Sequence, residues 1–294
     1  LADYMGDAVL DISILPNMAR NANVIGIARE LAALTGRQVR KQVDTYTGKH
    51  AQADNGTRNT QHATPNLQPV TELVEIEITD PELNPRFVVG LIRGVEIKPS
   101  PYTIQRRLKL AGQRPINSIV DATNYAMIEL GEPLHAFDYD VLVRRVSNSP
   151  NKKIKIITRA AKDGEKLTTL DGNERTLTSM NVLVCDEKGS LSLAGVMGGS
   201  ESEVTDKTKN VLLEGAAWNF INIRRTAKQH NLPSEASFRF SRGVHPALSE
   251  MGVKRGLQLM AEWSGCKIAP GRVYEYPLKQ KDSVVVVTPE DVKR

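Results

Sequence analysis

Hydrophobic residues occur along this chain in two different patterns, and each pattern predicts a different kind of secondary-structure element. Apolar positions that recur every three or four residues predict amphipathic helices over the segments 24–36, 100–112, 117–130, 219–229 and 246–264. Ser100-Pro101 gives the clearest helix start, because a capping hydroxyl precedes a proline at the first helical position. Gly36 and Gly131 are expected to end two of these helices.

Shorter apolar runs predict strands between the helices. The predicted strands cover 9–15, 74–78, 87–97, 154–158, 182–185, 191–196, 211–214 and 284–287. Asp171-Gly172 predicts the turn of a hairpin, and Thr288-Pro289 predicts the cap of a last helix. Because helices and strands are mixed without regular βαβ alternation, the predicted fold class is α+β rather than a doubly wound sheet.

One segment lacks any apolar period. From about Thr45 to Asn66 the chain is rich in Thr, Asn, Gln, His, Gly and Ala, which predicts a linker or long loop and the best domain boundary. His50 and His62 fall inside this segment and are interpreted as solvated.

Composition and charge are those of an ordinary globular protein with a small basic excess. Hydrophobic residues make up 40% and charged residues 25%. Lys and Arg outnumber Asp and Glu by 39 to 34, which permits contact with a polyanion without demanding it. Aromatic residues at 5% argue against a wide base-stacking surface. Basic residues cluster, either as solvated helix faces or as polyanion contacts, at Arg106, Arg107, Lys109 and Arg114, at Arg224, Arg225 and Lys228, and at Arg239 and Arg242.

The cysteines and the absence of targeting segments suggest the cellular compartment in which the protein works. Cys185 and Cys266 lie far apart, in no metal-ligand spacing and beside apolar residues, so both are predicted to be buried reduced thiols. No signal peptide opens the chain and no apolar run reaches membrane-spanning length, so a cytoplasmic location without membrane contact is expected. A start at Leu1 and an end at Asp-Val-Lys-Arg suggest a piece of a longer protein.

Polar residues interrupt the helix predicted over 117–130 and the segment after it. Asp121, Thr123 and Asn124 cost helix stability, so local hydrogen bonds should compensate for them. His135 follows a Gly-Glu-Pro break and is predicted to lie on a loop at a helix end. A neutral imidazole there could accept a proton from water, or it could be a structural histidine.

An acid and a glycine run come next as candidates. Glu214 ends an apolar strand, so it should need either a ligand or a nearby arginine to offset its desolvation. Residues 194–199 read Ala-Gly-Val-Met-Gly-Gly, and glycines after a strand can present backbone N–H groups to an oxyanion or phosphate. The run matches neither a P-loop nor a dinucleotide fingerprint.

A small-residue segment, Ser234-Glu235-Ala236-Ser237, could form a pocket wall or cap the following helix. A serine hydrolase triad of Ser234, His135 and Asp138 is conceivable, but the sequence lacks a nucleophile elbow, which argues against it.

Several of these motifs together resemble a known family. The run from Ser100 to Asp138 closely resembles the core of the bacterial-type phenylalanyl-tRNA synthetase beta subunit, in its tRNA-editing module. The motifs at 193–199, 210–214 and 234–244 resemble the same module, and the likeness covers about Glu77 to Tyr276. It implies a B3/B4 editing domain over 73–277 with a mixed α+β fold. Before it come part of a B1-like α/β segment (1–44) and a linker (45–72), and after it the start of a B5-like domain (278–294).

The resemblance also implies a function. Enzymes of this family are alpha2beta2 heterotetramers that charge phenylalanine tRNA using ATP and Mg²⁺ at a site in the alpha subunit, while the beta module hydrolyses wrongly attached tyrosine. By motif, no metal or cofactor belongs to this segment. The catalytic residues would be His135, Asn124, Gly195 and Gly198, the substrate-binding residues Glu214, Thr123, Pro133, Ser234 and Ala236, and the tRNA contacts Arg224 and Arg225.

Two departures from the family and one alternative function remain. Where the family more often has Thr-Asp-Ala-Ser, this chain has Ser234-Glu235-Ala236-Ser237, so the pocket wall is expected to differ by a methyl group. It also has Ser241 and His245 where the family often carries acids. The chain is either an active ester hydrolase or a catalytically silent module for tRNA binding and subunit assembly. His135, Asn124 and Glu214 together favour the hydrolase.

Overall fold

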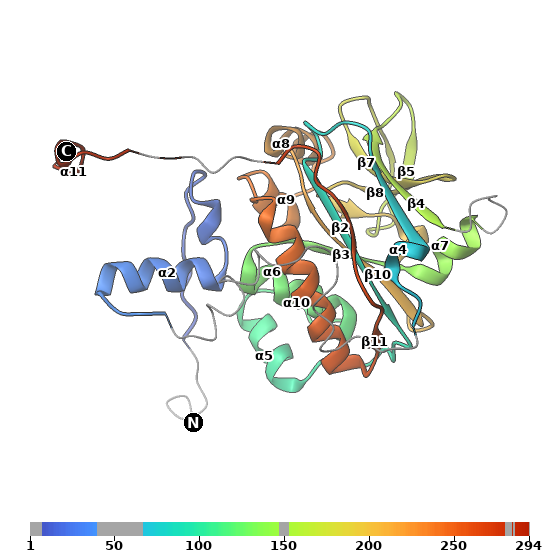
Figure 1. The fold of residues 1–294 in the computed structure, drawn as a ribbon, viewed down its shortest axis with the longest axis horizontal. Coiled ribbons are helices and arrows are strands. Elements are labelled where there is room, and N and C mark those ends of the chain that lie inside the picture. The colour runs from blue at the N-terminus through green and yellow to red at the C-terminus, as the bar shows by residue number, and fades with distance from the viewer. Residues whose placement is uncertain (1–7, 40–66, 147–152, 280–283, 285, 294) are drawn as a thin grey trace.

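The computed structural model describes residues 8–39, 67–146, 153–279, 284 and 286–293 (Figure 1). Two five-stranded sheets and the helices around them confirm the predicted α+β class. The first sheet has the order β1-β4-β7-β8-β9, made of Val74–Ile78, Ile154–Ala160, Val182–Asp186, Gly189–Leu193 and Met197–Gly198. The second has the order β11-β2-β10-β3, made of Lys267–Ile268, Arg86–Arg93, Asn210–Ala217 and Leu134–Asp138, with β12 (Val273–Glu275) also paired to β2.

Neighbouring strands are antiparallel except for the parallel pair β1 and β4. The hairpin predicted at Asp171-Gly172 is confirmed, since it joins β5 (Lys166–Thr168) to β6 (Glu174–Thr176). The helical elements are η1 (Ala19–Asn21), α2 (Val24–Thr35), α4 (Val70–Leu73), α5 (Tyr102–Leu110), α6 (Ser118–Leu130), α7 (Tyr139–Val146), η2 (Ser200–Ser202), α8 (Phe220–Gln229), α9 (Glu235–Phe240), α10 (Ala247–Ser264) and α11 (Pro289–Val292).

The amphipathic helices were predicted correctly, and asparagine side chains cap three of them. The Asn23, Asn117 and Asn219 side chains accept hydrogen bonds from backbone N–H groups at the starts of α2, α6 and α8. Gly36 and Gly131 end α2 and α6 in the left-handed conformation. The predicted cap at Thr288 is confirmed as a capping box with Asp291.

The predicted hydroxyl cap at Ser100 is wrong. Pro101 is the N-cap residue of α5 and no side chain caps this helix. The Ser100 hydroxyl instead donates to the Asp121 carboxylate at 2.5 Å, and the Ile116 N–H donates to the other carboxylate oxygen at 2.7 Å. This bond satisfies the expectation that local partners compensate for Asp121 inside α6.

Two predicted strands are absent, and several others differ in length. Residues 9–15 and the described part of 284–287 form no strand. Leu10 and Val286 are 77% and 83% exposed, and no described strand lies beside them to pair their backbone groups. The strand predicted over 87–97 ends at Arg93, and the one predicted over 191–196 runs instead from Gly189 to Leu193.

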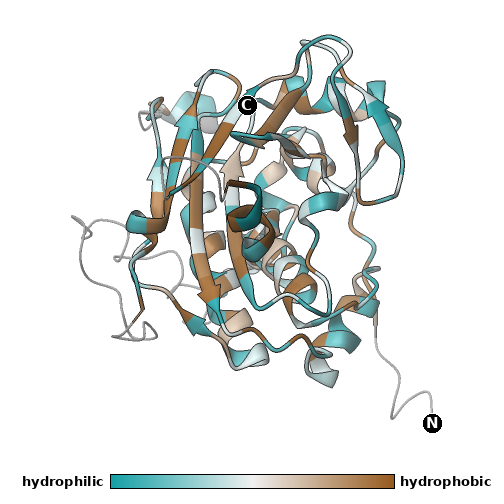
Figure 2. Ribbon diagram, turned by 90° about the vertical axis from the view of Figure 1, so that its right-hand side faces the viewer, coloured by the Kyte–Doolittle hydropathy of each residue, from teal (hydrophilic) through white to brown (hydrophobic). Residues whose placement is uncertain are grey.

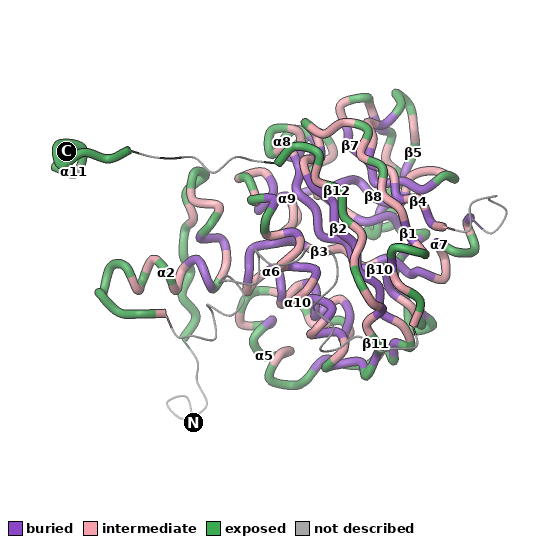
Figure 3. Tube along the Cα trace, in the orientation of Figure 1, coloured by how far each residue is buried: buried purple, intermediate pink, exposed green. Residues whose placement is uncertain are grey.

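The core has two layers, separated by the sheet that contains β2 and β10. Both faces of β2 are buried, so Phe87, Val89 and Leu91 pack toward the other sheet while Val88 and Ile92 pack beneath α6 and α10. A Cβ atom on Gly90 would lie 2.6 Å from the Leu257 side chain, so this glycine lets α10 approach the sheet closely. Figure 3 shows β2 and β10 buried and most of α2 and α11 exposed. In Figure 2 the strands are hydrophobic over much of their length.

Both cysteines are buried and unbonded, as predicted. Burial raises the pKa of the Cys185 thiol to about 12 and that of Cys266 to about 11. Among the described residues, no helix combines the length and the apolar character needed to cross a bilayer. The linker predicted over 45–72 lies mostly outside the described residues, as do His50 and His62.

Candidate functional site

A cavity of about 90 Å³ lies where β3, β10, α9 and the segment around β9 meet. Six of the residues predicted for the site line it, namely Pro133, His135, Gly195, Gly198, Glu214 and Ala236. The rest of the wall is mainly apolar and was not predicted from the sequence; it consists of Leu134, Ser192, Leu193, Val196, Met197, Trp218 and Phe240. The structure thus brings together residues from four separate stretches of sequence around one apolar space.

His135 and Glu214 are direct cross-strand neighbours in this cavity. They are paired in the register of β3 with β10, so their side chains leave the sheet on the same face. Nε2 of His135 and Oε2 of Glu214 are both buried, and neither atom has a hydrogen-bond partner. Because buried polar atoms normally have partners, this pair indicates a place for a water molecule or a polar ligand group.

Burial keeps both groups neutral at physiological pH. It raises the pKa of Glu214, which is 6% exposed, to about 8. It lowers the pKa of His135 to about 4. No described arginine pairs with Glu214, so the alternative of an acid with a salt-bridge partner is wrong for this residue. The cavity therefore holds a protonated carboxyl beside an uncharged imidazole.

His135 lies within strand β3, so its predicted place on a loop is wrong. The strand forms because it pairs with β10, which comes more than seventy residues later and cannot be inferred from the local sequence. The ring packs edge-on against Phe137, with centroids 4.5 Å apart. A Cβ atom on Gly198 would lie 2.3 Å from Cε1 of His135, so a glycine is needed for β9 to pass this close to the ring.

The glycine run turns beside the His135 ring. Gly195 has φ 65°, a conformation that favours glycine, and a Cβ atom there would meet the side chains of Ile223 and Trp218 at 2.8 Å. The Val196 N–H donates to Leu193 O at 3.0 Å, which closes the turn. The assignment of an oxyanion role to backbone N–H groups near Gly195 and Gly198 stays a prediction.

Ser234 lies next to the cavity but does not line it. Its hydroxyl accepts a hydrogen bond from the Ser237 N–H and donates one to Val196 O at 2.8 Å, and its own N–H is capped by Ser237. The interpretation of Ser234 as a helix cap is therefore confirmed, and its second bond holds the glycine turn against α9.

The serine hydrolase triad is excluded by the same geometry. Asp138 accepts hydrogen bonds from the Thr208 hydroxyl and the Val141 N–H, and it lies three positions after His135, on the other face of β3. The Ser234 hydroxyl is engaged by Val196 and Ser237.

Two predicted site residues, Thr123 and Asn124, are not part of the cavity lining. Both lie on α6, where the Thr123 hydroxyl donates to Val120 O at 2.7 Å. This bond is the local compensation expected for Thr123.

The predicted RNA contacts Arg224 and Arg225 are exposed on α8. Arg224 donates to Ser241 O at 2.9 Å. The described residues contain no group of three or more His, Cys, Asp and Glu side chains that could hold a metal ion.

Glu132 is a buried acid that the sequence analysis missed, because only the Gly-Glu-Pro break was considered there. It is 0% exposed, and neither carboxylate oxygen has a hydrogen-bond partner. Burial raises its pKa well above 4.5, and Glu214 raises it further once Glu214 itself is ionised, while nearby Ser249 and Arg86 lower it. The side chain fits because Gly252 of α10 has no Cβ, which would lie 2.6 Å from Cγ of Glu132.

Glu132→Gln is expected to stabilise the protein at neutral and higher pH. The folded chain keeps a proton on Glu132 that the unfolded chain releases above about pH 4.5, so this residue makes stability fall as pH rises. Removing its charge should raise the free energy of unfolding by on the order of 1–3 kcal/mol near pH 8 and change it little near pH 4.

Urea unfolding at the two pH values measures this effect, with Glu165→Gln as the control. Glu165 pairs with Arg159, which lowers the pKa of Glu165, so its replacement should destabilise near pH 8. Equal stability of Glu132→Gln and the unmodified protein near pH 8 would contradict the buried-acid interpretation.

Comparisons with known proteins show which family the chain resembles. A family model described as the B3/4 domain matches residues 83–265. The phenylalanine–tRNA ligase beta subunit of Geobacter sulfurreducens is 42% identical over 279 residues, covering 94% of this chain and 32% of that protein. The one from Moorella thermoacetica is 40% identical over 293 residues, covering 99% of this chain and 33% of that protein. The chain thus spans about a third of the length of these curated relatives.

Among solved structures, an N-terminal fragment of the phenylalanyl-tRNA synthetase beta-subunit from Pyrococcus horikoshii matches 90% of this chain and 65% of that chain. The two are 15% identical, with a TM-score of 0.43.

Proposed function

Because the chain belongs to the B3/4 domain family, we propose that it is the part of a phenylalanine–tRNA ligase beta subunit that removes tyrosine from mischarged phenylalanine tRNA. The observation that carries this proposal is the pair of unpartnered polar atoms, His135 Nε2 and Glu214 Oε2, inside an apolar cavity. An aromatic side chain with one hydroxyl group suits such a space, because its ring meets apolar walls and its hydroxyl meets a buried acceptor.

The proposed reaction is hydrolysis of the ester that joins tyrosine to the RNA. A water molecule held by His135 attacks the ester carbonyl carbon and gives a proton to the imidazole. The imidazole returns this proton to the ribose oxygen as the bond between that oxygen and the carbonyl carbon breaks, which releases tyrosine and the RNA hydroxyl. Backbone N–H groups near Gly195 and Gly198 stabilise the negative oxygen of the tetrahedral intermediate. Pro133 and Ala236 form walls of the cavity.

The wider assembly is part of the same proposal. The chain works in the cytoplasm beside an alpha subunit in an alpha2beta2 heterotetramer, and phenylalanine tRNA is the shared substrate. ATP and Mg²⁺ act at the synthetic site of the alpha subunit, and none of this chain's residues serves that step.

Deacylation of tyrosyl-tRNA and phenylalanyl-tRNA by the protein tests the proposal. Release of tyrosine well above the spontaneous rate, with phenylalanyl-tRNA spared, is expected. Binding of both RNAs without release of either amino acid would instead support a silent tRNA-binding and assembly module.

Replacement of both Arg224 and Arg225 by Gln is expected to weaken the salt dependence of RNA binding. Each phosphate contact releases about 0.7–0.9 counterion, so two lost contacts should reduce the slope of log affinity against log salt by about 1.4–1.8. Filter binding or fluorescence anisotropy over a salt series measures the slope. An unchanged slope would indicate that both residues lie on a solvated helix face and do not contact RNA.

A further inference from the structure

A small cationic and aromatic surface lies on α9, across the helix from the cavity. Ala236 and Phe240 of α9 line the cavity, and Phe238, two positions from each, points to the opposite side of the helix. Phe238 is 39% exposed, although large aromatic side chains are usually buried. We call Phe238, Arg242 and Arg224 together the Phe238 platform.

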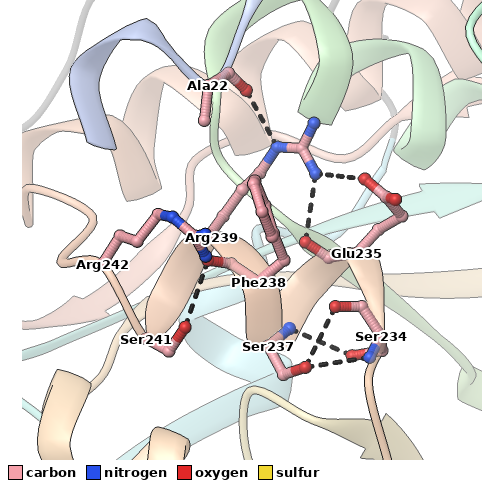
Figure 4. A network of polar contacts seen from close by, with 8 residues as sticks. All are labelled: Ala22, Ser234, Glu235, Ser237, Phe238, Arg239, Ser241 and Arg242. Carbon is pink, nitrogen blue, oxygen red and sulfur yellow. Dashed lines mark hydrogen bonds and ion pairs between the residues drawn. The ribbon is translucent and has the colours of Figure 1, made fainter. Parts of the chain in front are cut away.

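The arginines of the platform are arranged around the aromatic ring. The Arg242 guanidinium lies 3.6 Å from the centroid of the Phe238 ring, and its Nη1 donates to Phe238 O at 2.8 Å. Arg224 reaches over from α8 and donates to Ser241 O at 2.9 Å, which fixes it beside Arg242. Figure 4 shows Arg242 and Arg239 on either side of Phe238.

Positive charge on this surface is not neutralised. The acid of the cluster, Glu235, is bonded to Arg239, which also donates to Ala22 O and so helps anchor the N-terminal segment (Figure 4). No described carboxylate pairs with Arg224 or Arg242. Desolvation, together with the charges of Arg224 and Arg239, lowers the pKa of Arg242. Such a group of arginines is expected to bind a negatively charged partner most strongly.

We propose that the Phe238 platform binds the single-stranded 3′ end of the RNA whose ester enters the cavity, with a base stacked on the outer face of the Arg242 guanidinium, which itself lies on the Phe238 ring, and with phosphates on Arg224. Exposed aromatic rings and cations that follow a backbone are the means by which proteins hold single strands. The helix between platform and cavity is about 10–12 Å across, a span of one or a few nucleotides. This inference rests on the proposed function, since it assumes that an RNA ester occupies the cavity.

The test uses a short single-stranded RNA with the fluorescent base 2-aminopurine near its 3′ end. Its fluorescence should be quenched on binding, because a stacked base loses emission. Phe238→Leu should remove the quenching and weaken affinity about tenfold, since the Arg242 guanidinium on which the base stacks loses the aromatic ring that holds it in place. Arg224→Gln should reduce the salt slope by about 0.7.

A matched control lies on α5, which is below α9 in the view of Figure 1. Tyr102 is an exposed aromatic residue of this helix, so Tyr102→Leu should leave quenching and affinity unchanged. A blunt RNA duplex and polyglutamate should bind weakly. Equal binding of polyglutamate, or unchanged quenching in Phe238→Leu, would overturn the inference.

The outcomes separate this inference from the proposed function. If Phe238→Leu binds RNA normally while the protein still hydrolyses tyrosyl-tRNA, the platform is wrong and the hydrolase stands. If quenching depends on Phe238 but no tyrosine is released, the platform stands and the hydrolase is wrong. Thermal unfolding of each variant excludes loss of folding as the cause.

Discussion

His135→Ala should slow the release of tyrosine from tyrosyl-tRNA by roughly 10²–10⁴-fold, the contribution of one general base. The Nε2 atom of His135 is buried without a partner and faces the cavity, so it is placed to hold and deprotonate a water molecule. Binding of the RNA should change little, because the arginines on α8 and α9 lie outside the cavity. Single-turnover deacylation measures the chemical step without product release.

His245→Ala is the matched control, since His245 is exposed and its Nδ1 accepts the Ala247 N–H near the start of α10. It should deacylate at the normal rate. A full rate in His135→Ala would make His135 a structural residue and leave positioning and the oxyanion contacts to carry the reaction.

The pH dependence of the reaction should reflect the low pKa of His135. An imidazole with a pKa of about 4 stays able to accept a proton through the whole neutral range. The rate should therefore vary little as pH falls from neutrality toward 5 and decline only as pH approaches 4. Folding stability should also decline over this range, because the unfolded chain takes up a proton on His135 below about pH 6.5 and the folded chain does not.

Features that depend only on residues close together in the sequence could be predicted from the sequence. The helices α2, α6 and α10 were found from apolar periodicity, and glycine stops marked the ends of α2 and α6, because both signals are local. The family was predicted correctly from linear motifs, as the match to the B3/4 domain shows. The residues of the glycine run and of β10 that line the cavity stood out in the sequence, because glycines after a strand and an acid in an apolar strand are unusual. Their roles in catalysis and binding stay predictions.

Contacts between distant segments explain what the sequence did not reveal. His135 was placed on a loop because its pairing with Glu214 depends on β10, and the hydroxyl of Ser100 reaches Asp121 instead of capping its own helix. The wall residues Trp218 and Met197 are ordinary apolar residues, and only the fold brings them to the cavity. The neutral state of Glu214 likewise depends on how completely the fold excludes water from it.

Glu214→Ala should abolish most of the discrimination between tyrosyl and phenylalanyl esters, a loss of about 1–3 kcal/mol or roughly 5- to 150-fold. With tyrosine in the cavity, the phenol O–H donates to the otherwise unpartnered Oε2 of Glu214. With phenylalanine that oxygen stays buried and unsatisfied. From the sequence, Glu214 was predicted to bind the substrate. In the empty cavity, the pKa of about 8 makes the side chain a neutral carboxyl at physiological pH, and its oxygen still accepts the phenol.

The protonation of Glu214 gives this prediction a second, sharper test. As pH rises through about 8 the carboxyl becomes charged, and a phenylalanine ester would then leave a buried charge unpaired. Discrimination by the unmodified protein should therefore increase with pH. Glu214→Gln keeps an acceptor that cannot ionise, so it should retain part of the discrimination and lose its rise with pH. Ratios of kcat/KM for the two esters, measured on both sides of this pH, separate the cases, and a Glu214→Ala variant that still spares phenylalanyl-tRNA would refute the assignment.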